Sequence, residues 1–446
     1  MRADGGKLYR MIWRWHFYAG LAVVPFILLL SLTGAIYLFK PQLDAWQERE
    51  WRGLPTAQAV SPDAQLQAAL AAVPGASFHS YRLPQSPGDA AVIHVGLSSG
   101  GMRDIAVSPQ GKVIAIDDPD ARIAATVQRV HGSLLLGLPG GLLVETAACW
   151  AILLILSGLY LWWPRGRGLA GVVWPRLRAG GRSFWRDLHA VTGFWVSGLA
   201  LVLLVSGLPW TDGWATAFRM VRGELGLVQG AQQWKGGIDL HAEHDHAAML
   251  AAETHHHTAP SGWTLTRMVA HARAEAMPPP AILSPPGAPD AFCPPNGNVW
   301  KLSSETQNRP LARSISYDPV SGAVLSRSGF ADKHPIDRLI GYGIAWHEGQ
   351  LLGWANQLIG LLTALALITL AVSGIFMWWC RRPGGSLGAP PRVSDARLRA
   401  AAAITLVLAL RLPMLALSLL ALFVIDRLLL PLWPRAQRWL DRARLS

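Results

Sequence analysis

The sequence predicts a polytopic α-helical membrane protein, and three observations lead to that fold class. About half of the chain is hydrophobic, 51% of 446 residues, and only 15% is charged, against roughly 25% in a typical soluble protein. The hydrophobic residues gather in runs long enough to cross a bilayer, and the arginines gather beside the ends of those runs. These features exclude an ordinary cytosolic enzyme, and the high hydrophobicity excludes an intrinsically disordered chain.

Four apolar segments are expected to form the core transmembrane helices, because a helix of about 20 residues crosses the hydrocarbon layer. Each segment is rich in Leu, Ile, Val and Ala and nearly free of charge. The first is expected to be a retained anchor rather than a signal peptide, since Lys40-Pro41 follows it in place of a cleavage site. The segments are 17–39, 142–163, 194–210 and 358–379.

The basic residues predict the orientation. They crowd the N-terminus, the linker between the second and third segments, and the stretch after the fourth, and the positive-inside rule places these regions in the cytoplasm. The two long loops, 40–129 and 211–345, have nearly balanced charge and are expected in the periplasm of a Gram-negative cell. A multi-pass membrane protein in contact with lipid is therefore expected, and the net charge of +12 requires no nucleic-acid partner.

The apolar tail, 398–430, predicts a C-terminal hydrophobic helix or hairpin. Pro413 interrupts it, and proline usually kinks or ends a helix because it lacks a backbone donor. One kinked span would leave the final arginines outside the cytoplasm, whereas a hairpin of two short helices returns them to it. We favour the hairpin.

Matching spacings indicate that the four core helices are two helix-loop-helix repeats. Parallel repeats of this kind recur in membrane proteins. Each match joins a histidine to a Ser-Gly or Thr-Gly dipeptide further along the chain. His16 to Thr33-Gly34 and His189 to Ser206-Gly207 are both 17 residues, and His131 to Ser157-Gly158 and His347 to Ser373-Gly374 are both 26.

The two long loops predict small α+β domains. Each contains two extended runs around a Pro/Gly turn, which predicts β-hairpins at Gly111 and Gly322. Segment 276–298 is rich in Pro and Gly and is expected to be a stiff loop. The expected units are 1–39 (cytoplasmic N-terminus and helix 1), 40–130 (periplasmic domain 1), 131–163 (helix 2 with an outer histidine), 164–186 (basic cytoplasmic linker), 187–210 (helix 3), 211–345 (periplasmic domain 2), 346–380 (helix 4) and 381–446 (cytoplasmic linker and hydrophobic hairpin).

Four histidines are the candidate functional residues. The orientation places His16 and His189 near the cytoplasmic face, and His131 and His347 near the periplasmic face. Two neutral imidazoles on facing helices are typical of the axial ligation of a b-type haem, so two haems are expected. A zinc site would take four ligands, with more Cys or carboxylates nearby. The alternative for each histidine is an interfacial side chain bonded to a headgroup or a carbonyl.

The neighbouring residues suit a porphyrin. Gly20 and Gly193 follow their histidines by one turn and leave room for a flat macrocycle. Arg14 and Arg186 are expected to meet the haem propionates.

A histidine-rich tract in the second loop is a separate candidate metal site. It contains His241, His244, His246, His255, His256 and His257. The alternative is a solvated polar loop.

Several motifs resemble the PepSY-associated transmembrane family over roughly residues 8–385. The second and fourth segments also end in Trp-Trp-x-Arg. The motifs are Arg14-Trp-His16-x3-Gly20, His131-Gly-Ser-Leu-Leu-Leu-Gly137, Leu188-His189-x3-Gly193 and His347-Glu-Gly-Gln-Leu-Leu-Gly353.

The resemblance implies an iron-regulated inner-membrane protein with PepSY-like periplasmic domains. Members similar to the siderophore-reductase branch reduce ferric siderophores with two haems. It implies that the four histidines ligate the irons of two haem b groups and that a ferric siderophore is reduced in the periplasm, releasing Fe(II). A separate cytoplasmic electron donor or a quinol is expected, because the chain shows no dinucleotide-binding motif. No catalytic residue is assigned beyond the haem ligands.

Other functions stay open at this point. The histidine-rich tract favours a reductase of cupric or simple ferric ions. A non-haem permease for siderophore or iron is a second alternative, although such transporters usually carry polar residues at mid-membrane, where this chain has Leu, Val and Ala. A regulatory protein whose loops bind a partner is a third, and it would leave the paired histidines without a role.

Overall fold

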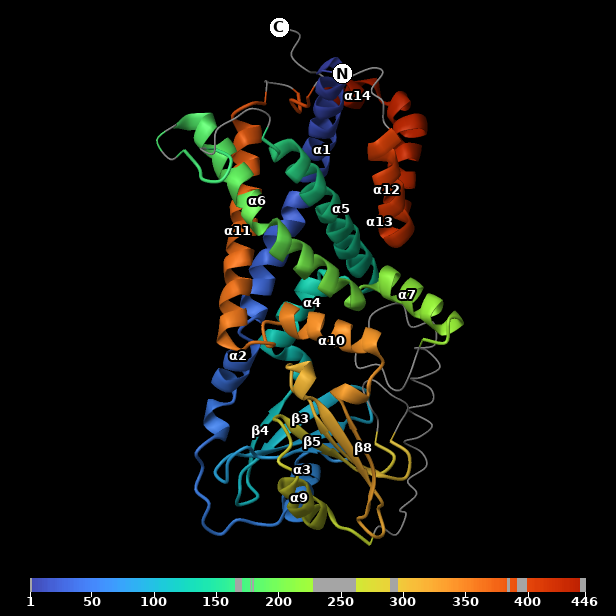
Figure 1. Cartoon of the computed structure of the whole chain (residues 1–446). Helices are drawn as coiled ribbons and strands as arrows, with labels where there is room; N and C mark the ends of the chain where they lie inside the picture. Colours follow the sequence, from blue (N-terminus) through green and yellow to red (C-terminus); the bar gives the residue numbers. More distant parts are fainter. Residues whose placement is uncertain are drawn as a thin grey trace.

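A bundle of long helices stands on an eight-stranded β-sheet (Figure 1). We call the end of the bundle beside the sheet the sheet end, and the opposite end, where the N-terminus and the last helix lie, the terminal end. This computed structural model describes residues 2–164, 171–176, 178, 180–227, 262–288, 296–382, 386–390 and 399–441.

Within the described residues, five helices are long and apolar enough to cross a membrane. Four of them contain the expected apolar segments, and the fifth candidate span, Pro413–Leu432, lies in the C-terminal tail. The third helix starts six residues earlier than expected, inside the basic linker. The four helices are α1 (Arg2–Tyr37), α5 (Leu138–Trp162), α6 (Gly181–Gly207) and α11 (Trp354–Trp379).

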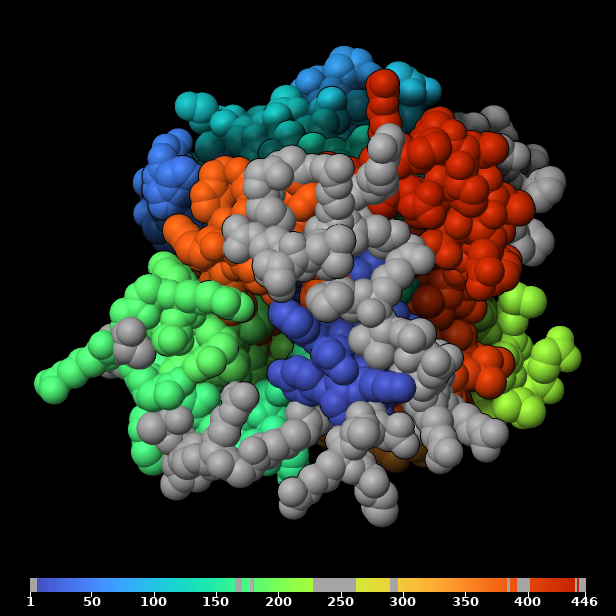
Figure 2. Space-filling model, turned by 90° about the horizontal axis from the view of Figure 1, so that it is seen from above, coloured from blue at the N-terminus to red at the C-terminus, as the bar shows by residue number. Residues whose placement is uncertain are grey.

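These four helices pack on one another. Helix α11 lies against α6 and α1, and α5 lies against α1 and α6. Small residues allow the close approach of α1 and α5, where Val23 is buried with Ala147 and Ala151. Seen from the terminal end, α1 (blue) lies in the middle, between α6 (green) and the C-terminal helices (red), as Figure 2 shows.

The expected second and fourth helices are each interrupted, which corrects the ranges 131–163 and 346–380. His131 lies on a short helix, α4 (Ile123–Ser133), and α5 begins only at Leu138. The chain turns between them through Leu134 and Leu135, whose φ angles of 54° and 60° are left-handed and end the helix. In the second repeat, α10 (Pro335–His347) stops before α11 in the same way. Figure 1 shows α10 lying across the long helices, just above the sheet.

The two long loops do not form two separate domains, because their strands join in one antiparallel sheet. The order is β4-β3-β2-β1-β5-β6-β7-β8, so each loop supplies one half. The halves meet where Tyr81 and Arg82 pair with Leu283 and Ile282. The strands are β1 (Ser77–Arg82), β2 (Ala91–Gly96), β3 (Met102–Val107), β4 (Val113–Asp117), β5 (Ala281–Ser284), β6 (Trp300–Ser304), β7 (Arg313–Tyr317) and β8 (Val324–Gly329).

One helix from each loop covers the same face of the sheet. Helices α3 (Pro62–Ala72) and α9 (Leu265–Ala274) pack over a core that draws residues from both halves. Asp63 accepts hydrogen bonds from the first backbone N–H groups of α9, at 3.2 Å from Leu265 and 3.0 Å from Thr266. The two loops are therefore joined by strand pairing, by a shared core and by a helix cap.

Both predicted hairpins are confirmed, and the expected loop is partly wrong. Strands β3 and β4 flank Gly111, and β7 and β8 flank Gly322, and these glycines have φ angles of 80° and 69°. Segment 276–298 contains β5, the strand that joins the two halves. Because Pro-rich residues flank this four-residue strand, the sequence pattern predicted a loop.

Short helices connect the spans to the sheet. Helix α2 (Lys40–Gln47) follows α1, and α7 (Asp212–Glu224) follows α6. Among the residues that the structure describes, six 3-10 segments complete the connections. They are Arg49–Trp51, Pro119–Ala121, Leu208–Trp210, Arg309–Leu311, Phe330–Asp332 and Leu430–Leu432.

The C-terminal tail breaks at Pro413 and returns to the terminal end. Helix α12 (Arg399–Arg411) is followed by α13 (Pro413–Val424), a π-helical turn (Ile425–Leu429) and α14 (Pro434–Asp441). A residue before these helices and a residue of α14 both contact α1. Arg14 donates to the carbonyl of Pro390, and the Tyr18 hydroxyl donates to that of Leu440 at 2.9 Å. This is the arrangement expected of a hairpin.

Candidate functional site

The four predicted histidines form two pairs, one near each end of the bundle. At the terminal end, the ring centres of His16 (α1) and His189 (α6) are 6.5 Å apart, with the rings at 88°. At the sheet end, the rings of His131 (α4) and His347 (α10) are 6.4 Å apart, at 79°. Each pair therefore takes one histidine from each repeat.

The spacing within each pair fits one metal ion between two imidazoles. A metal–imidazole bond is about 2.0–2.1 Å and the ring centre lies about 1.1 Å beyond the nitrogen, so a linear pair has centres about 6.3 Å apart. Both observed separations agree with this value. Within the described residues, no group of three or more His, Cys, Asp or Glu is arranged to hold a metal ion.

The Nδ1 atom of each histidine forms a hydrogen bond with a hydroxyl on a long helix of the same repeat. These four serine and threonine hydroxyls all donate to carbonyls of their own helix, so their oxygens accept from the imidazole Nδ1–H. The partners are Ser157 for His16 at 2.8 Å, Thr33 for His131 at 2.9 Å, Ser373 for His189 at 3.1 Å and Ser206 for His347 at 3.2 Å.

This hydrogen bond decides which ring nitrogen faces a ligand. A neutral imidazole whose Nδ1 carries the proton presents a lone pair at Nε2. His189 and His347 also donate from Nδ1 to the carbonyls of Leu370 and Leu203, at 3.0 and 2.9 Å, which requires the same tautomer. An outer partner on Nδ1 is the usual support of a metal-ligating histidine.

The glycine after each hydroxyl makes room for the ring. A Cβ atom on that glycine would stand 3.1–3.6 Å from Cε1 of the histidine, which is close or crowded contact. Each Ser-Gly or Thr-Gly dipeptide therefore forms a hydrogen bond with one histidine through its hydroxyl and leaves space for the ring at its glycine. The sequence spacings identified these dipeptides as equivalent positions of the two repeats but did not predict their contacts with the histidines. The four contacts are Gly34 with His131, Gly158 with His16, Gly207 with His347 and Gly374 with His189.

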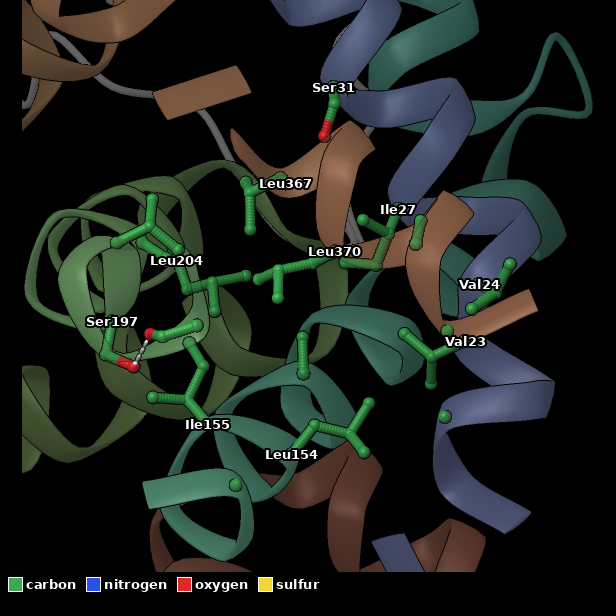
Figure 3. Close-up of a pocket in the computed structure, with 18 of the residues that line it drawn as sticks. Val23, Val24, Ile27, Ser31, Leu154, Ile155, Ser197, Leu204, Leu367 and Leu370 are labelled. Atoms are coloured by element: carbon green, nitrogen blue, oxygen red, sulfur yellow. Dashed lines mark hydrogen bonds between the residues drawn. The ribbon is translucent and has the colours of Figure 1, made fainter. Parts of the chain in front are cut away.

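A continuous cavity of about 740 Å³ joins the two pairs, within the roughly 300–1,000 Å³ range of cofactor sites. All four histidines line it, and so do Gly20 and Gly193 as expected from the sequence. The lining residues labelled in Figure 3 are mostly aliphatic, with Ser31 and Ser197 as the polar ones among them. The labelled apolar residues there are Val23, Val24, Ile27, Leu154, Ile155, Leu204, Leu367 and Leu370.

The two ends of the cavity differ in charge. At the terminal end, Arg182, Arg186 and Arg381 line it, and among the described residues no Asp or Glu does. At the sheet end, the described lining residues include no Arg or Lys. Trp210 lies there, edge-on to His347 at 5.8 Å between ring centres.

The two arginines predicted from the sequence differ in position. Arg186 lines the cavity, and its guanidinium is held by the neighbouring Asp187 at 3.0 Å. Arg14 does not line it, because its side chain lies 5.1 Å from the centre of the Tyr18 ring and donates to Pro390. Arg182 and Arg381 were missed, although the second ends the Trp-Trp-x-Arg motif.

The histidine-rich tract of residues 241–257 lies outside the described residues.

Comparison with known proteins fits the architecture. No curated protein sequence matches this chain. The family model described as the PepSY-associated TM region matches residues 13–381, which includes all four histidines, the sheet and the four long helices. With five apolar helices that could span a bilayer, the chain is a multi-pass membrane protein. It belongs to the PepSY-associated transmembrane family.

Proposed function

We propose that this protein is a di-haem oxidoreductase of the bacterial inner membrane. It passes electrons from the cytoplasmic side to a periplasmic ferric siderophore and releases Fe(II) for uptake. The observation that supports this most strongly is the pair of bis-histidine sites at opposite ends of one apolar cavity.

The residues present fit haem b. Two pairs of imidazoles have the separation that one iron needs, and their Nδ1 atoms are already bonded, so Nε2 is the coordinating atom. His16 and His189 would hold one group, and His131 and His347 the other. Gly20 and Gly193 give the flat macrocycle access to the helix backbone. When bound, haem b supplies one-electron transfer.

The helix spacing supports sites near the two faces of a bilayer. Thr33, which holds His131, is 17 residues after His16 on the continuous helix α1, and Ser206 is 17 residues after His189 on α6. At 1.5 Å per residue these intervals are about 26 Å, close to the roughly 30 Å hydrocarbon thickness. The side chains between them are mostly aliphatic, which favours a cavity interior with little water.

The reactants reach opposite ends in this proposal. The sheet lies beside the His131–His347 pair and provides the surface where a ferric chelate docks. The terminal end carries the basic linkers that the positive-inside rule assigns to the cytoplasm, where a separate donor protein or a quinol supplies electrons. A permease is less well supported, because the cavity middle has aliphatic side chains where a polar chelate would need polar ones.

The first test counts haems. Full-length protein is purified in detergent from cells supplied with iron and a haem precursor, and its reduced-minus-oxidised spectrum and pyridine haemochrome are recorded. We expect two b-haems in the wild type and one in each of His16→Ala and His347→Ala. His271→Ala is the matched control, since His271 lies on α9 against the sheet and should leave both haems bound. A well-folded wild type without haem would refute the proposal.

The second test follows substrate reduction. The reduced protein is mixed with a ferric hydroxamate siderophore, and haem reoxidation is recorded by stopped flow while a ferrous chelator traps the product. We expect one Fe(II) for each haem oxidised, and slow or no reoxidation in His347→Ala. Reoxidation by cupric ion or by simple ferric salts alone, with none by the chelate, would replace the siderophore with a free-ion substrate.

A further inference from the structure

The terminal end of the cavity carries more positive charge than its acids balance. Asp187 is the carboxylate beside this end, and two arginines already form ion pairs with that carboxylate. Arg176 approaches Asp187 in two-pronged fashion at 2.6 and 3.0 Å, and Arg186 binds it at 3.0 Å. Arg182 and Arg381 have no carboxylate within ion-pair distance among the described residues, so an outside anion would complete this end.

The surroundings of the Arg381 guanidinium suit the binding of an anion. Its guanidinium stacks beside two aromatic rings of α1, 5.1 Å from the centre of Trp13 and 5.0 Å from that of Phe17. Its Nε is buried and makes no hydrogen bond. Burial lowers the pKa of Arg381, and the positive charge of Arg182 lowers it further. A partly buried cation with an unsatisfied donor, close to a second cation, is stabilised when an anion binds.

The two arginines lie at matched distances from the histidine pair. Arg182 is seven residues before His189 on α6, and Arg381 is seven residues after Gly374, the residue of α11 that contacts the His189 ring. At 1.5 Å per residue, each lies about 10 Å beyond the imidazoles along the bundle. Helices α6 and α11 pack together, so both guanidiniums stand at one level of the cavity mouth.

We propose that Arg182 and Arg381 form a carboxylate site that binds the propionates of the macrocycle held by His16 and His189. The inference rests on the proposed function and deepens it. Guanidinium groups bind carboxylates through paired, charge-assisted hydrogen bonds, which suits this role better than the lone charge of a lysine. The same chemistry would accept the phosphate of an anionic lipid headgroup, so the test must separate these two sources.

The charge asymmetry makes the proposal specific to one site. In the described part of the chain, no Arg or Lys lines the cavity beside His131 and His347, so only the terminal-end haem should depend on these arginines. The binding of haem b is compared with that of its dimethyl ester, whose propionates are uncharged and cannot form ion pairs. Full-length His347→Ala, which leaves only the terminal-end pair complete, serves as the background for titration of haem-free protein.

In that background we expect the ester to bind roughly tenfold to hundredfold more weakly than haem b, because charge-assisted hydrogen bonds are lost. Arg381→Met and Arg182→Met should weaken haem b and bring the two ligands close to equal affinity, while Arg381→Lys should recover part of the difference. Arg382→Met is the matched control. Arg382 stacks on Trp379 at 3.6 Å, is not among the cavity-lining residues, and should leave the preference unchanged.

If the His347→Ala protein, with Arg182 and Arg381 intact, bound haem b and its dimethyl ester with equal affinity, the proposal would be overturned. This comparison does not depend on the folding of any arginine variant. A lipid headgroup would be the occupant if phosphatidylglycerol raised the unfolding temperature of the protein but not of Arg381→Met, with no ester effect. Failure of haem b to bind the wild type at either pair would refute the proposed function itself, a result distinct from a missing ester effect.

Discussion

Arg222 of α7 and Asp337 of α10 form a buried two-pronged ion pair, with N–O distances of 2.8 and 2.9 Å and only 2% and 6% of their side chains exposed. Asp337 lies in the first turn of the helix that ends at His347. In the other repeat, Arg122 precedes α4, the helix that carries His131, and binds Glu48 at 2.7 Å. Both short histidine helices are thus anchored at their N-terminal ends, with the charges exchanged between repeats.

Arg222→Ala should destabilise the sheet end and weaken haem binding there. It removes the two-pronged partner of the buried Asp337, and breaking a buried ion pair typically costs about 3–5 kcal/mol. We expect a lower unfolding temperature and loss of the haem bound at His347, with the terminal-end haem retained, as measured by thermal unfolding and haem counting.

The control for this prediction is the exposed pair of Arg327 and Glu275, where Arg327→Ala should change the unfolding temperature little. The double variant Arg222→Met with Asp337→Leu should recover stability, since it buries no unpaired charge. A single variant as stable as the wild type would show that this pair does not anchor α10.

Gly207→Ala should disturb the His347 site without unfolding the helix. The added methyl would stand 3.1 Å from Cε1 of His347, so the ring must shift by a few tenths of an ångström. We expect weaker haem binding at the sheet end and altered low-spin signals in electron paramagnetic resonance. Gly198→Ala, on the same helix, meets open space and should behave as the wild type. Identical spectra for the two variants would mean that Gly207 does not set the ring position.

Ser157→Ala should have a larger effect than Ser373→Ala, although both remove a hydroxyl from an imidazole Nδ1. His16 relies on the Ser157 hydroxyl, whereas His189 keeps the carbonyl of Leu370 at 3.0 Å. Loss of such an outer partner usually costs roughly 10–100-fold in metal affinity. Haem titration and the midpoint potential of the terminal-end haem should therefore change clearly in the first variant and little in the second. The reverse order would contradict the assigned hydrogen bonds.

The junction between α2 and the sheet should loosen only in acid. Burial raises the pKa of Glu48, but Arg82 at 2.9 Å and Arg122 at 2.7 Å outweigh it and hold that pKa below its usual range. A carboxylate with a lowered folded-state pKa contributes stability that is complete above its unfolded pKa of about 4.3 and is lost as pH falls through the folded value.

Hydrogen exchange of β1 should therefore be constant from about pH 5 to 8, after correction for the intrinsic rate, and should rise below about pH 4. Glu48→Gln should exchange faster at pH 7 and lose most of this acid dependence. Exchange that accelerates between pH 6 and 7 in the wild type would point to histidine rather than Glu48.

The histidine pairs were predictable from the sequence because the rise of a helix is constant, so equal spacings place equivalent residues at equal depths. The position of Arg14 was predicted less well, because adjacency in sequence is not adjacency on a helix. Arg14 precedes His16 by two residues and points to another face, whereas Arg186 precedes His189 by three and shares its face.

The merged sheet was not predictable in the same way. The pairing of β1 with β5 joins Tyr81 to Leu283, about 200 residues away, and no local pattern specifies a partner at that distance. The break after α4 depends on Leu134 and Leu135 in left-handed conformations, for which Leu gives no sequence signal. Tertiary packing decides both features.

The C-terminal tail should return to the side of the membrane that holds the N-terminus. Pro390 precedes the tail helices and Leu440 lies in the last of them, α14, and both contact α1, through Arg14 and Tyr18. Exposed Cys380, just after α11, is a native reporter for the terminal end, while Cys149 is buried. In a background with Cys293→Ser, Cys380 should react with a membrane-impermeant maleimide only in inverted vesicles. With Cys380→Ser added, Arg435→Cys should also react only in inverted vesicles, and Val320→Cys, in the exposed β7–β8 turn, only in spheroplasts. Labelling of Arg435→Cys from the same side as Val320→Cys would require a single kinked span in place of the hairpin.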